Sequence, residues 1–370
     1  MPDKQNKVFV AMSGGVDSSL AAALLKGAGY DVVGISMHLW CEEKRGPGRQ
    51  KKPCCSVEDI QDAREVCRRL EIPHYVLNLE DEFIERVVNY FLKEYNLGRT
   101  PNPCLACNEH IKFDILLNRI LALGGRYLAT GHYARIVPAP GGYRLQKARD
   151  GTKDQSYVLY TLGQKQLDRL LFPLGDHTKV EVREMAARLD LSIAAKPDSQ
   201  QICFIPDGRY GSFISRSSLC VPGEIRDKEG NYLGMHQGIA FYTIGQRRGL
   251  GASFGRPVFV QRIEPATNTI ILGDDSDLYA GVLFAGNLNW VSGEAPEVPV
   301  KVEAKIRYRT SPAQATLSIE GDCARVEFDK PMRAITPGQA VVFYLGETVL
   351  GGGIIEGTGS VSNALGHNSP

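Results

Sequence analysis

The feature that most constrains the fold is a short apolar strand followed at once by a glycine turn and the start of a helix. The apolar run Val8–Met12 predicts a buried parallel strand. After the turn, Leu20, Leu24 and Leu25 share one helical face, and Gly27 marks the helix end. The chain therefore opens with a strand–turn–helix unit whose turn can face a ligand.

The turn has the composition of a phosphate-binding loop. Two adjacent glycines let the backbone approach a ligand closely and take positive φ, while free amides and the positive end of the helix dipole face that ligand. Serine hydroxyls add donors, and the carboxylate of Asp17 can hold a metal ion. Pyrophosphate with Mg²⁺ suits this arrangement best. The predicted loop comprises Ala11, Met12, Ser13, Gly14, Gly15, Val16, Asp17 and Ser18.

Two familiar nucleotide-binding motifs do not match this stretch. A Walker A loop requires a lysine near its end, and the stretch contains none. The G-x-G-x-x-G fingerprint of dinucleotide-binding folds is also missing from it. An ordinary glycine turn does not need an aspartate and the three serines Ser13, Ser18 and Ser19, so we interpret the stretch as a ligand-binding loop.

Further apolar runs predict strands of the same sheet at Asp31–Met37, Tyr75–Leu79 and Tyr127–Thr130. Amphipathic helices that begin at Ser56 and span Asp81–Tyr95 lie between them. Alternating strands and helices predict an α/β fold with a doubly wound parallel sheet. Ligands bind at the carboxyl edge of such sheets, where the second strand also ends.

The character of the chain changes twice beyond residue 197. Short alternating strands with glycine turns begin near Gly208, and Asn287–Gly352 predicts a small barrel or sandwich. The end of the chain is rich in Gly, Ser and Asn, so we expect disorder there. We therefore expect a nucleotide-binding catalytic domain at residues 1–206, a small β-rich domain at 207–280, and a C-terminal barrel with a disordered tail at 281–370.

Length and composition limit the number of domains, the possible partners and the expected location of the protein. A length of 370 residues predicts two or three domains. The net charge is +1, so any RNA contact must use local basic patches. The start is polar, and no apolar run approaches the roughly 20 residues of a membrane span, so we expect a cytoplasmic protein with no membrane partner. Nine cysteines then indicate reactive or metal-bound thiols rather than a disulfide scaffold.

Three cysteines stand in suggestive places. Cys104 and Cys107 form a C-x-x-C pair at a helix start, where the helix dipole favours the thiolate. Cys203 lies far along the chain in a linker-like segment. The basic stretch from Cys41 to Cys55 contacts RNA phosphates or is only solvated, and the pattern leaves both readings open. Cys41, Cys54 and Cys55 lack the histidine spacing of a zinc site.

With the phosphate-binding loop and the three cysteines taken together, the chain resembles the tRNA-specific 2-thiouridylases. These are bacterial members of the PP-loop ATP pyrophosphatase superfamily that place sulfur on C2 of the wobble uridine. The match runs from about residue 7 to 356. Its motifs are Ala11–Ser19, Cys54–Ser56, Thr100–Pro103, Cys107–Asn108, Ile111–Phe113, Ala129–Arg135, Lys153–Tyr157, Ser199–Ile205, Thr243–Arg248 and Arg307–Arg309.

The resemblance implies a role for each group. ATP with Mg²⁺ would lie on the loop, lined also by Met37 and Gly131. The uracil C2 oxygen would be adenylated, Cys203 would carry sulfur as a persulfide, and Cys107 would act as nucleophile and form a disulfide with Cys203. The tRNA would be contacted by Asn102, Pro103, Cys104, His132, Lys153, Asp154, Gln155, Arg307, Tyr308 and Gln339.

The resemblance also implies partners, and the chain departs from the pattern of many relatives at one position. Lysine, glutamine and glutamate tRNAs are the expected substrates, and a cysteine desulfurase or a sulfur carrier is the expected donor. Many relatives have aspartate where this chain has Cys104, which puts the role of that aspartate in doubt here. Cys104, Cys107 and Cys203 form an alternative ligand set for a [4Fe–4S] cluster that would hold hydrosulfide.

Three other functions compete with this interpretation. An amide-forming PP-loop ligase would need the loop but no distant cysteine. A non-catalytic RNA-binding module would use only the β-rich half. A zinc deaminase would match Pro103-Cys104-x-x-Cys107, but none of the seven histidines stands in the H-x-E half of that signature.

Overall fold

The computed structural model describes residues 6–40, 57–191, 193–198, 202–205, 210–217, 220–251 and 255–359. The basic stretch with Cys41, Cys54 and Cys55, the helix-opening Ser56 and the expected disordered tail from residue 360 lie outside the described residues. In the described part, no helix is both long and apolar enough to cross a membrane.

The amino-terminal sheet is parallel and has five strands in the order β3-β2-β1-β4-β7. Alternate residues of its first strand face opposite layers, because side chains alternate along a strand. Val8 and Val10 pack on one side with Leu20, whereas Phe9 joins the apolar cluster on the other side. The predicted doubly wound α/β fold is confirmed. The strands are β1 Lys7–Ala11, β2 Asp31–His38, β3 His74–Asn78, β4 Tyr127–Ala129 and β7 Leu170–Leu171.

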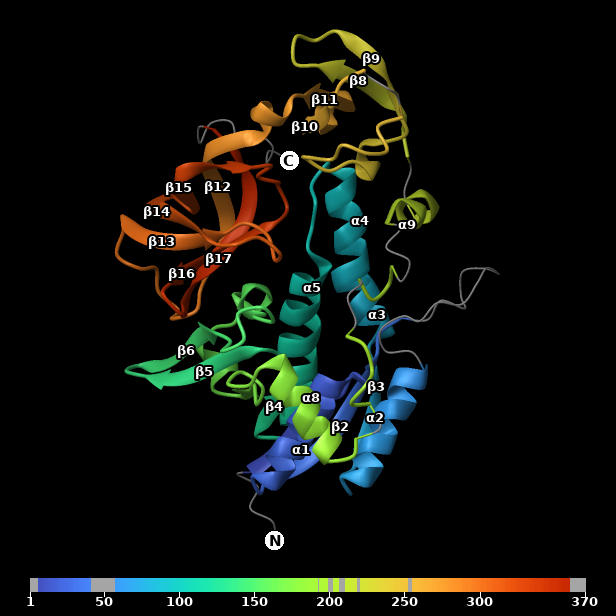
Figure 1. Cartoon of the computed structure of the whole chain (residues 1–370), viewed down its shortest axis with the longest axis vertical. Coiled ribbons are helices and arrows are strands. Elements are labelled where there is room, and N and C mark those ends of the chain that lie inside the picture. Colours follow the sequence, from blue (N-terminus) through green and yellow to red (C-terminus); the bar gives the residue numbers. More distant parts are fainter. Residues whose placement is uncertain are drawn as a thin grey trace.

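Helices cover both faces of this sheet (Figure 1). One layer contains α1 Val16–Gly27, α2 Val57–Arg69 and α8 Lys179–Arg188. The other layer has two long helical runs, each with a π-helical middle that the sequence pattern did not predict. These runs are α3 Glu80–Phe83, η3 Ile84–Val88 and α4 Asn89–Asn96, and then α5 Pro103–Ala106, η4 Cys107–Leu116 and α6 Leu117–Ala122.

The carboxyl-terminal strands form a closed antiparallel barrel in the order β12-β15-β14-β13-β16-β17, because β12 also pairs with β17. A hairpin of the amino-terminal half extends the same sheet, since Gln146 pairs with Thr348 of β17. One sheet therefore joins segments far apart in sequence. The strands are β5 Ala134–Ala139, β6 Gly142–Lys147, β12 Tyr279–Trp290, β13 Val300–Lys305, β14 Ala313–Glu320, β15 Cys323–Arg333, β16 Ala340–Leu345 and β17 Thr348–Thr358.

The central region is a four-stranded sheet in the order β10-β11-β8-β9, preceded by a helix, α9 Tyr210–Ser217. The sequence pattern predicted only strands here. The helix forms because Phe213 packs among Trp40, Phe91 and Phe204 of the first domain. The strands are β8 Gly223–Asp227, β9 Tyr232–His236, β10 Phe259–Glu264 and β11 Thr269–Gly273; short helices are η5 Ser156–Leu159, α7 Gln164–Leu167, η6 Ile239–Phe241, η7 Pro265–Thr267 and η8 Asp275–Leu278.

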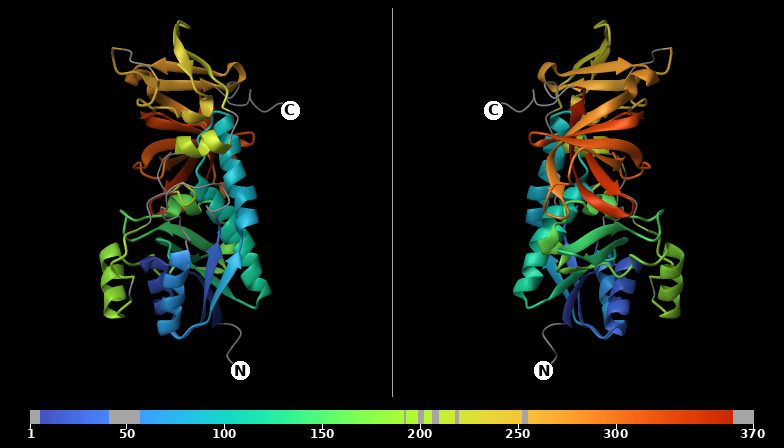
Figure 2. Two further views of the ribbon diagram at one scale, coloured as in Figure 1. Left: turned by 90° about the vertical axis from the view of Figure 1, so that its right-hand side faces the viewer. Right: turned by 90° about the vertical axis from the view of Figure 1, so that its left-hand side faces the viewer.

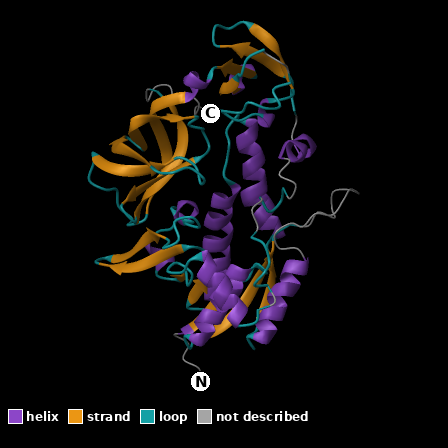
Figure 3. Cartoon of the chain, viewed as in Figure 1, coloured by secondary structure: helices purple, strands orange, loops and turns teal. Residues whose placement is uncertain are grey.

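The three regions are arranged along the long axis of the molecule. Figure 2 shows the parallel sheet at the end that carries the amino terminus, with the central sheet at the opposite end. Helices gather around the parallel sheet and strands dominate the remainder (Figure 3). The long helical run through α4 extends from the first region toward the central sheet, so residues 97–102 lie where regions meet.

Candidate active site

The predicted phosphate-binding loop connects β1 to the first turn of α1. Gly14 has φ +69°, and a Cβ atom there would lie 2.2 Å from the Asp59 carbonyl oxygen. Gly131, after β4, abuts the start of α1, because a Cβ there would lie 2.7 Å from the Ser18 nitrogen. Both positions therefore require glycine, because Gly14 lies close to the backbone of Asp59 and Gly131 lies close to the backbone of Ser18.

Serine hydroxyls hold the loop in shape. The Ser18 hydroxyl accepts from the Ser13 amide at 3.1 Å and donates to the Gly15 carbonyl at 3.2 Å. The Ser19 hydroxyl donates to the same carbonyl at 2.9 Å. Ser18 and Ser19 are buried. The sequence analysis expected these hydroxyls to be ligand donors, whereas here they brace the loop and leave its backbone amides to face a ligand.

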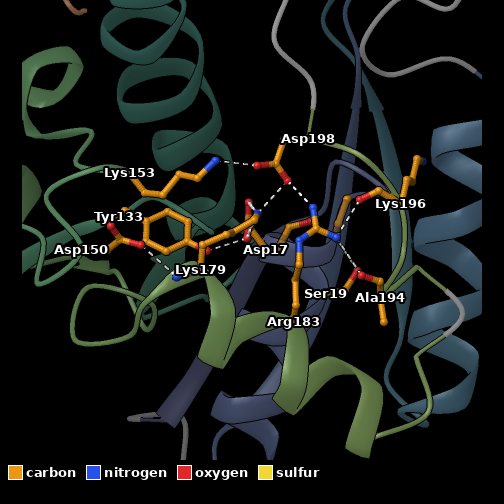
Figure 4. Close-up of polar contacts among 12 residues, drawn as sticks. Asp17, Ser19, Tyr133, Asp150, Lys153, Lys179, Arg183, Ala194, Lys196 and Asp198 are labelled. Carbon is orange, nitrogen blue, oxygen red and sulfur yellow. Dashed lines mark hydrogen bonds and ion pairs between the residues drawn. The ribbon is translucent and has the colours of Figure 1, made fainter.

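Asp17 belongs to a group of five charged residues, which we call the Asp198 cluster: Asp17, Lys153, Lys179, Arg183 and Asp198. The Lys179 ammonium lies 2.7 and 2.8 Å from the two Asp17 carboxylate oxygens and 2.8 Å from an Asp198 oxygen (Figure 4). Asp198 also accepts from Lys153 at 2.9 Å and from Arg183 at 2.8 Å. The Tyr133 hydroxyl donates to Asp17 at 2.8 Å.

The charges of this cluster reinforce one another. Burial tends to raise the pKa of the Asp198 carboxyl, but hydrogen bonds from Lys179 and Lys153 outweigh it and lower that pKa to about 2. Lys179 is buried, and its ammonium group lies between the carboxylates of Asp17 and Asp198. Sequence reasoning missed Lys179, although Thr178 and Glu181 form a capping box that marks it as the first residue of a helix.

A second lysine joins the loop to α2. The Lys196 ammonium donates to the Gly14 carbonyl at 2.9 Å, to Asp59 at 2.7 Å and to Asp62 at 2.6 Å. Burial tends to lower the pKa of Lys196, but the hydrogen bonds that its ammonium donates to the two carboxylates produce a net rise. Lys196 therefore stays charged and ties the phosphate-binding loop to α2.

The C-x-x-C pair begins the second long helical run, as predicted. The Asn102 side chain caps this run by accepting from the Cys104 amide at 3.1 Å and the Leu105 amide at 3.4 Å, and Pro103 takes the first helical position. Cys104 is exposed, while Cys107 is buried in the apolar cluster on that face of the sheet. Cys203 is partly buried and packs against the same cluster.

The iron–sulfur alternative does not fit this arrangement. Across the described ranges, which include Cys104, Cys107 and Cys203, no three His, Cys, Asp or Glu side chains lie close enough together to hold a metal ion. We therefore derive no step through a cluster.

Comparison with known proteins decides the family. Residues 6–207 match the family described as tRNA methyl transferase HUP domain, residues 211–274 the tRNA methyl transferase PRC-barrel domain, and residues 281–355 the Aminomethyltransferase beta-barrel domain. The chain is 50% identical over 353 residues to the tRNA-specific 2-thiouridylase MnmA of Lachnoclostridium phytofermentans, covering 94% of this chain and 99% of the relative. It is 52% identical over 359 residues to that of Moorella thermoacetica, covering 95% and 100%. The chain belongs to the tRNA-specific 2-thiouridylase family.

Several side chains that the family resemblance assigns to tRNA make contacts within the chain. Gln339 donates to the Thr100 carbonyl at 2.7 Å, and Arg307 donates to the Thr336 hydroxyl at 2.7 Å. Gln155 accepts from the Tyr133 amide at 2.9 Å, and Asp154 accepts from the Ser156 hydroxyl at 2.8 Å. These side chains therefore hold neighbouring segments of the chain together.

His132 and Met37 are buried. The His132 ring packs against Phe113 and Phe172, and burial, with Lys112 nearby, lowers its pKa well below the ordinary range. His132 is therefore neutral at pH 7 and does not act as a cation toward phosphate. Met37 is 6% exposed and packs in the same apolar cluster, near the carboxyl end of β2.

Tyr308 is one of the exposed side chains among the expected tRNA contacts, with 37% of its surface exposed. Burial of the remainder raises its pKa, and the nearby charges of Asp154 and the Cys104 thiolate add to the rise. Lys305 lies 5.7 Å from the Tyr308 ring centroid and 5.9 Å from that of Tyr157. The barrel thus presents a partly exposed aromatic ring with a lysine ammonium over it.

Proposed function

We propose that this chain is an ATP-dependent tRNA sulfurtransferase that converts the wobble uridine to 2-thiouridine. One observation carries the proposal: a chain of hydrogen bonds links the phosphate-binding loop to the cysteine helix. Asp17 accepts from the Tyr133 hydroxyl, the Tyr133 amide donates to Gln155, and the Val158 carbonyl, three residues on, accepts from Asn108 at 3.0 Å. Asn108 directly follows Cys107. Nucleotide and thiol chemistry are therefore built on one connected scaffold.

The first step uses the loop. The uracil C2 oxygen attacks the α-phosphorus of ATP, a new P–O bond forms, and pyrophosphate leaves. Gly14 and Gly131 let the loop pack closely against Asp59 and the start of α1, and Asp17 is the loop carboxylate suited to Mg²⁺. The C2 oxygen, a poor leaving group on its own, becomes part of AMP.

The second step uses the cysteines. Cys203 carries a persulfide supplied by a cysteine desulfurase or a sulfur carrier. Cys107 attacks the Cys203 sulfur, a Cys107–Cys203 disulfide forms, and the released hydrosulfide attacks C2 and expels AMP. In the other route, the terminal persulfide sulfur attacks C2 directly and expels AMP. Cys107 then attacks the Cys203 sulfur, which breaks its bond to the sulfur on C2 and forms the Cys107–Cys203 disulfide. In both routes a two-electron reductant returns the disulfide to two thiols.

The remaining assignments follow the same proposal. Lysine, glutamine and glutamate tRNAs are the proposed substrates and the cytoplasm is the proposed location. Cys104, which is exposed at the start of the cysteine helix, is the proposed accessory thiol beside the target base. We retain residues 1–206, 207–280 and 281–370 as the proposed domains.

The test is mass spectrometry of nucleosides from tRNA incubated with the protein, ATP, Mg²⁺ and a working sulfide source. We expect 2-thiouridine from the wild type and none from Cys107→Ser or Cys203→Ser. Cys323→Ser is the matched control, because Cys323 is a buried cysteine of the barrel strand β15. An amide-forming ligase would keep its activity in Cys203→Ser, and absence of 2-thiouridine from the wild type would reject the proposal.

A further inference from the structure

Three cations converge on one carboxylate beside the phosphate-binding loop. Asp198 lies within 2.8–2.9 Å of nitrogens of Lys179, Arg183 and Lys153. With Asp17, the Asp198 cluster contains three cations and two carboxylates, so it keeps one excess positive charge at the edge of the loop. The family resemblance assigns no role to Lys179, Arg183 or Asp198.

The cluster is open to anions from solvent. The side chains of Asp17, Lys153 and Arg183 are 32%, 36% and 34% exposed, while Lys179 is 11% exposed behind them. An anion that reaches the loop therefore meets the lysines without any unfolding. Carboxylate and phosphate oxygens are interchangeable acceptors for an ammonium group.

Arg183 differs from the two lysines in how firmly it is held. One guanidinium nitrogen donates to the Ala194 carbonyl at 2.9 Å and to the Lys196 carbonyl at 3.1 Å, while another donates to Asp198 (Figure 4). Arg183 therefore anchors the 194–198 segment and continues to neutralise Asp198 when other partners leave. The ammonium groups of Lys153 and Lys179 are on flexible stems and donate to carboxylates of the cluster.

We propose that Asp198 is an exchangeable internal anion: it holds Lys179 and Lys153 beside the loop, gives them up to the polyphosphate of an incoming nucleoside triphosphate, and takes them back when pyrophosphate leaves. Because Arg183 stays on Asp198, this carboxylate keeps a cation during the exchange. Movement of Lys179 toward phosphate also frees Asp17, the predicted Mg²⁺ ligand. The inference rests on the proposed function only in requiring that the loop binds a triphosphate.

The test measures binding of Mg²⁺-pyrophosphate, ATP and AMP by titration calorimetry in the absence of tRNA. Asp198→Asn removes the competing charge, so pyrophosphate and ATP should bind about threefold more tightly. Lys179→Met removes a charged donor and should weaken both by about tenfold or more. AMP, which lacks the pyrophosphate portion, should bind within about twofold of wild type in both variants.

Controls separate the inference from loss of fold and from failure of the proposed function. Arg188→Met, on the same helix α8 in an exposed pair with Glu184, should change none of these affinities. Lys179→Arg keeps the charge and should retain most pyrophosphate binding. It is the informative variant if Lys179→Met is poorly folded. Weaker pyrophosphate binding in folded Asp198→Asn would show that Asp198 is only a scaffold and would overturn the exchange. If the wild type binds no nucleotide, the proposed function fails first; if it binds ATP and thiolates tRNA but Asp198→Asn leaves affinity unchanged, only this inference fails.

Discussion

At the scale of single residues, Gly14 has a backbone conformation and a neighbourhood that exclude any side chain. Its φ of +69° lies in the left-handed region, and the Asp59 carbonyl occupies the space of a Cβ. The conformational cost of a non-glycine residue there is about 1–2 kcal/mol before any overlap is relieved. Relief of the overlap must move either the loop or α2.

We expect Gly14→Ala to reduce the free energy of unfolding by at least about 2 kcal/mol and to abolish measurable ATP binding. Urea unfolding and calorimetric titration with ATP check the two effects. Gly27→Ala, at the end of α1 with no atom near its added methyl group, is the control and should be neutral or slightly stabilising. Normal ATP affinity in Gly14→Ala would show that the loop does not need its present shape.

Asp198 predicts a pH dependence of stability. Its pKa in the folded protein is about 2, below its ordinary value of 3.8, because lysine hydrogen bonds favour the carboxylate. The unfolded chain therefore takes up this proton at higher pH than the folded chain does. The stabilisation by Asp198 is complete above about pH 4 and is lost as pH falls toward about 2.

The measurement is the difference in unfolding free energy between wild type and Asp198→Asn at several pH values. We expect the variant to be less stable at about pH 6, with the difference shrinking as pH falls below about 4. Asp176→Asn, whose carboxylate is 78% exposed, is the control. A difference that does not change with pH would mean that the lysines do not stabilise the Asp198 carboxylate.

At the scale of elements, the start of α8 decides where Lys179 lies. The Thr178 hydroxyl accepts from the Glu181 amide at 3.3 Å, and Glu181 accepts from the Thr178 amide at 2.7 Å. Asp150 accepts from the Lys179 amide at 3.0 Å. A capping box and a carboxylate from another loop together fix the first turn of this helix.

Thr178→Ala should therefore lower stability by about 1 kcal/mol and weaken pyrophosphate binding, because the first turn that carries Lys179 is loosened. Thr178→Ser keeps the capping oxygen and should restore both properties. Urea unfolding and pyrophosphate titration provide the two measurements. Loss of stability without any change in affinity would show that α8 positions Lys179 by its packing on α1 alone.

At the scale of the whole molecule, all three regions contact the segment before the C-x-x-C pair. The Thr100 amide donates to the Pro337 carbonyl at 2.9 Å, and its hydroxyl lies 3.3 Å from that of Thr243 in the central region. Gln339 of the barrel donates to the Thr100 carbonyl and, at 3.4 Å, to that of Pro101. The barrel and the central region thus fix the entry to the cysteine helix.

Gln339→Ala leaves these carbonyls without their amide donor, so we expect a loss of about 1–2 kcal/mol in stability. The same change should raise the KM for tRNA severalfold while ATP affinity stays unchanged, because the phosphate-binding loop is distant in the fold. Gln314→Ala, an exposed glutamine of the same barrel, is the control. An unchanged KM for tRNA would contradict a positioning role for Gln339.

Local sequence patterns predicted elements well wherever a short segment carries its own signal. The apolar run before Gly14 and the helix start at the C-x-x-C pair both depend on neighbouring residues. The prediction was wrong at α9, since Phe213 and its neighbours gain their helix from packing against Phe204 and Trp40. The π-helical middles of the two long runs were also missed, because their periodicity differs little from that of an α-helix.

What the sequence alone determined is therefore the parallel sheet, the phosphate-binding loop at its edge and the thiols near a helix start, since each arises from residues within a few positions of one another. The tertiary structure alone decided that Lys179 and Asp198 complete the loop and that Gln339 holds the segment before Cys104. The contact between Asp17 and Lys179 joins residues 162 positions apart, and that between Thr100 and Gln339 joins residues 239 positions apart. Ion pairs and hydrogen bonds across such separations form only when α8 packs on α1 and the barrel closes against the first domain, so no local periodicity records them.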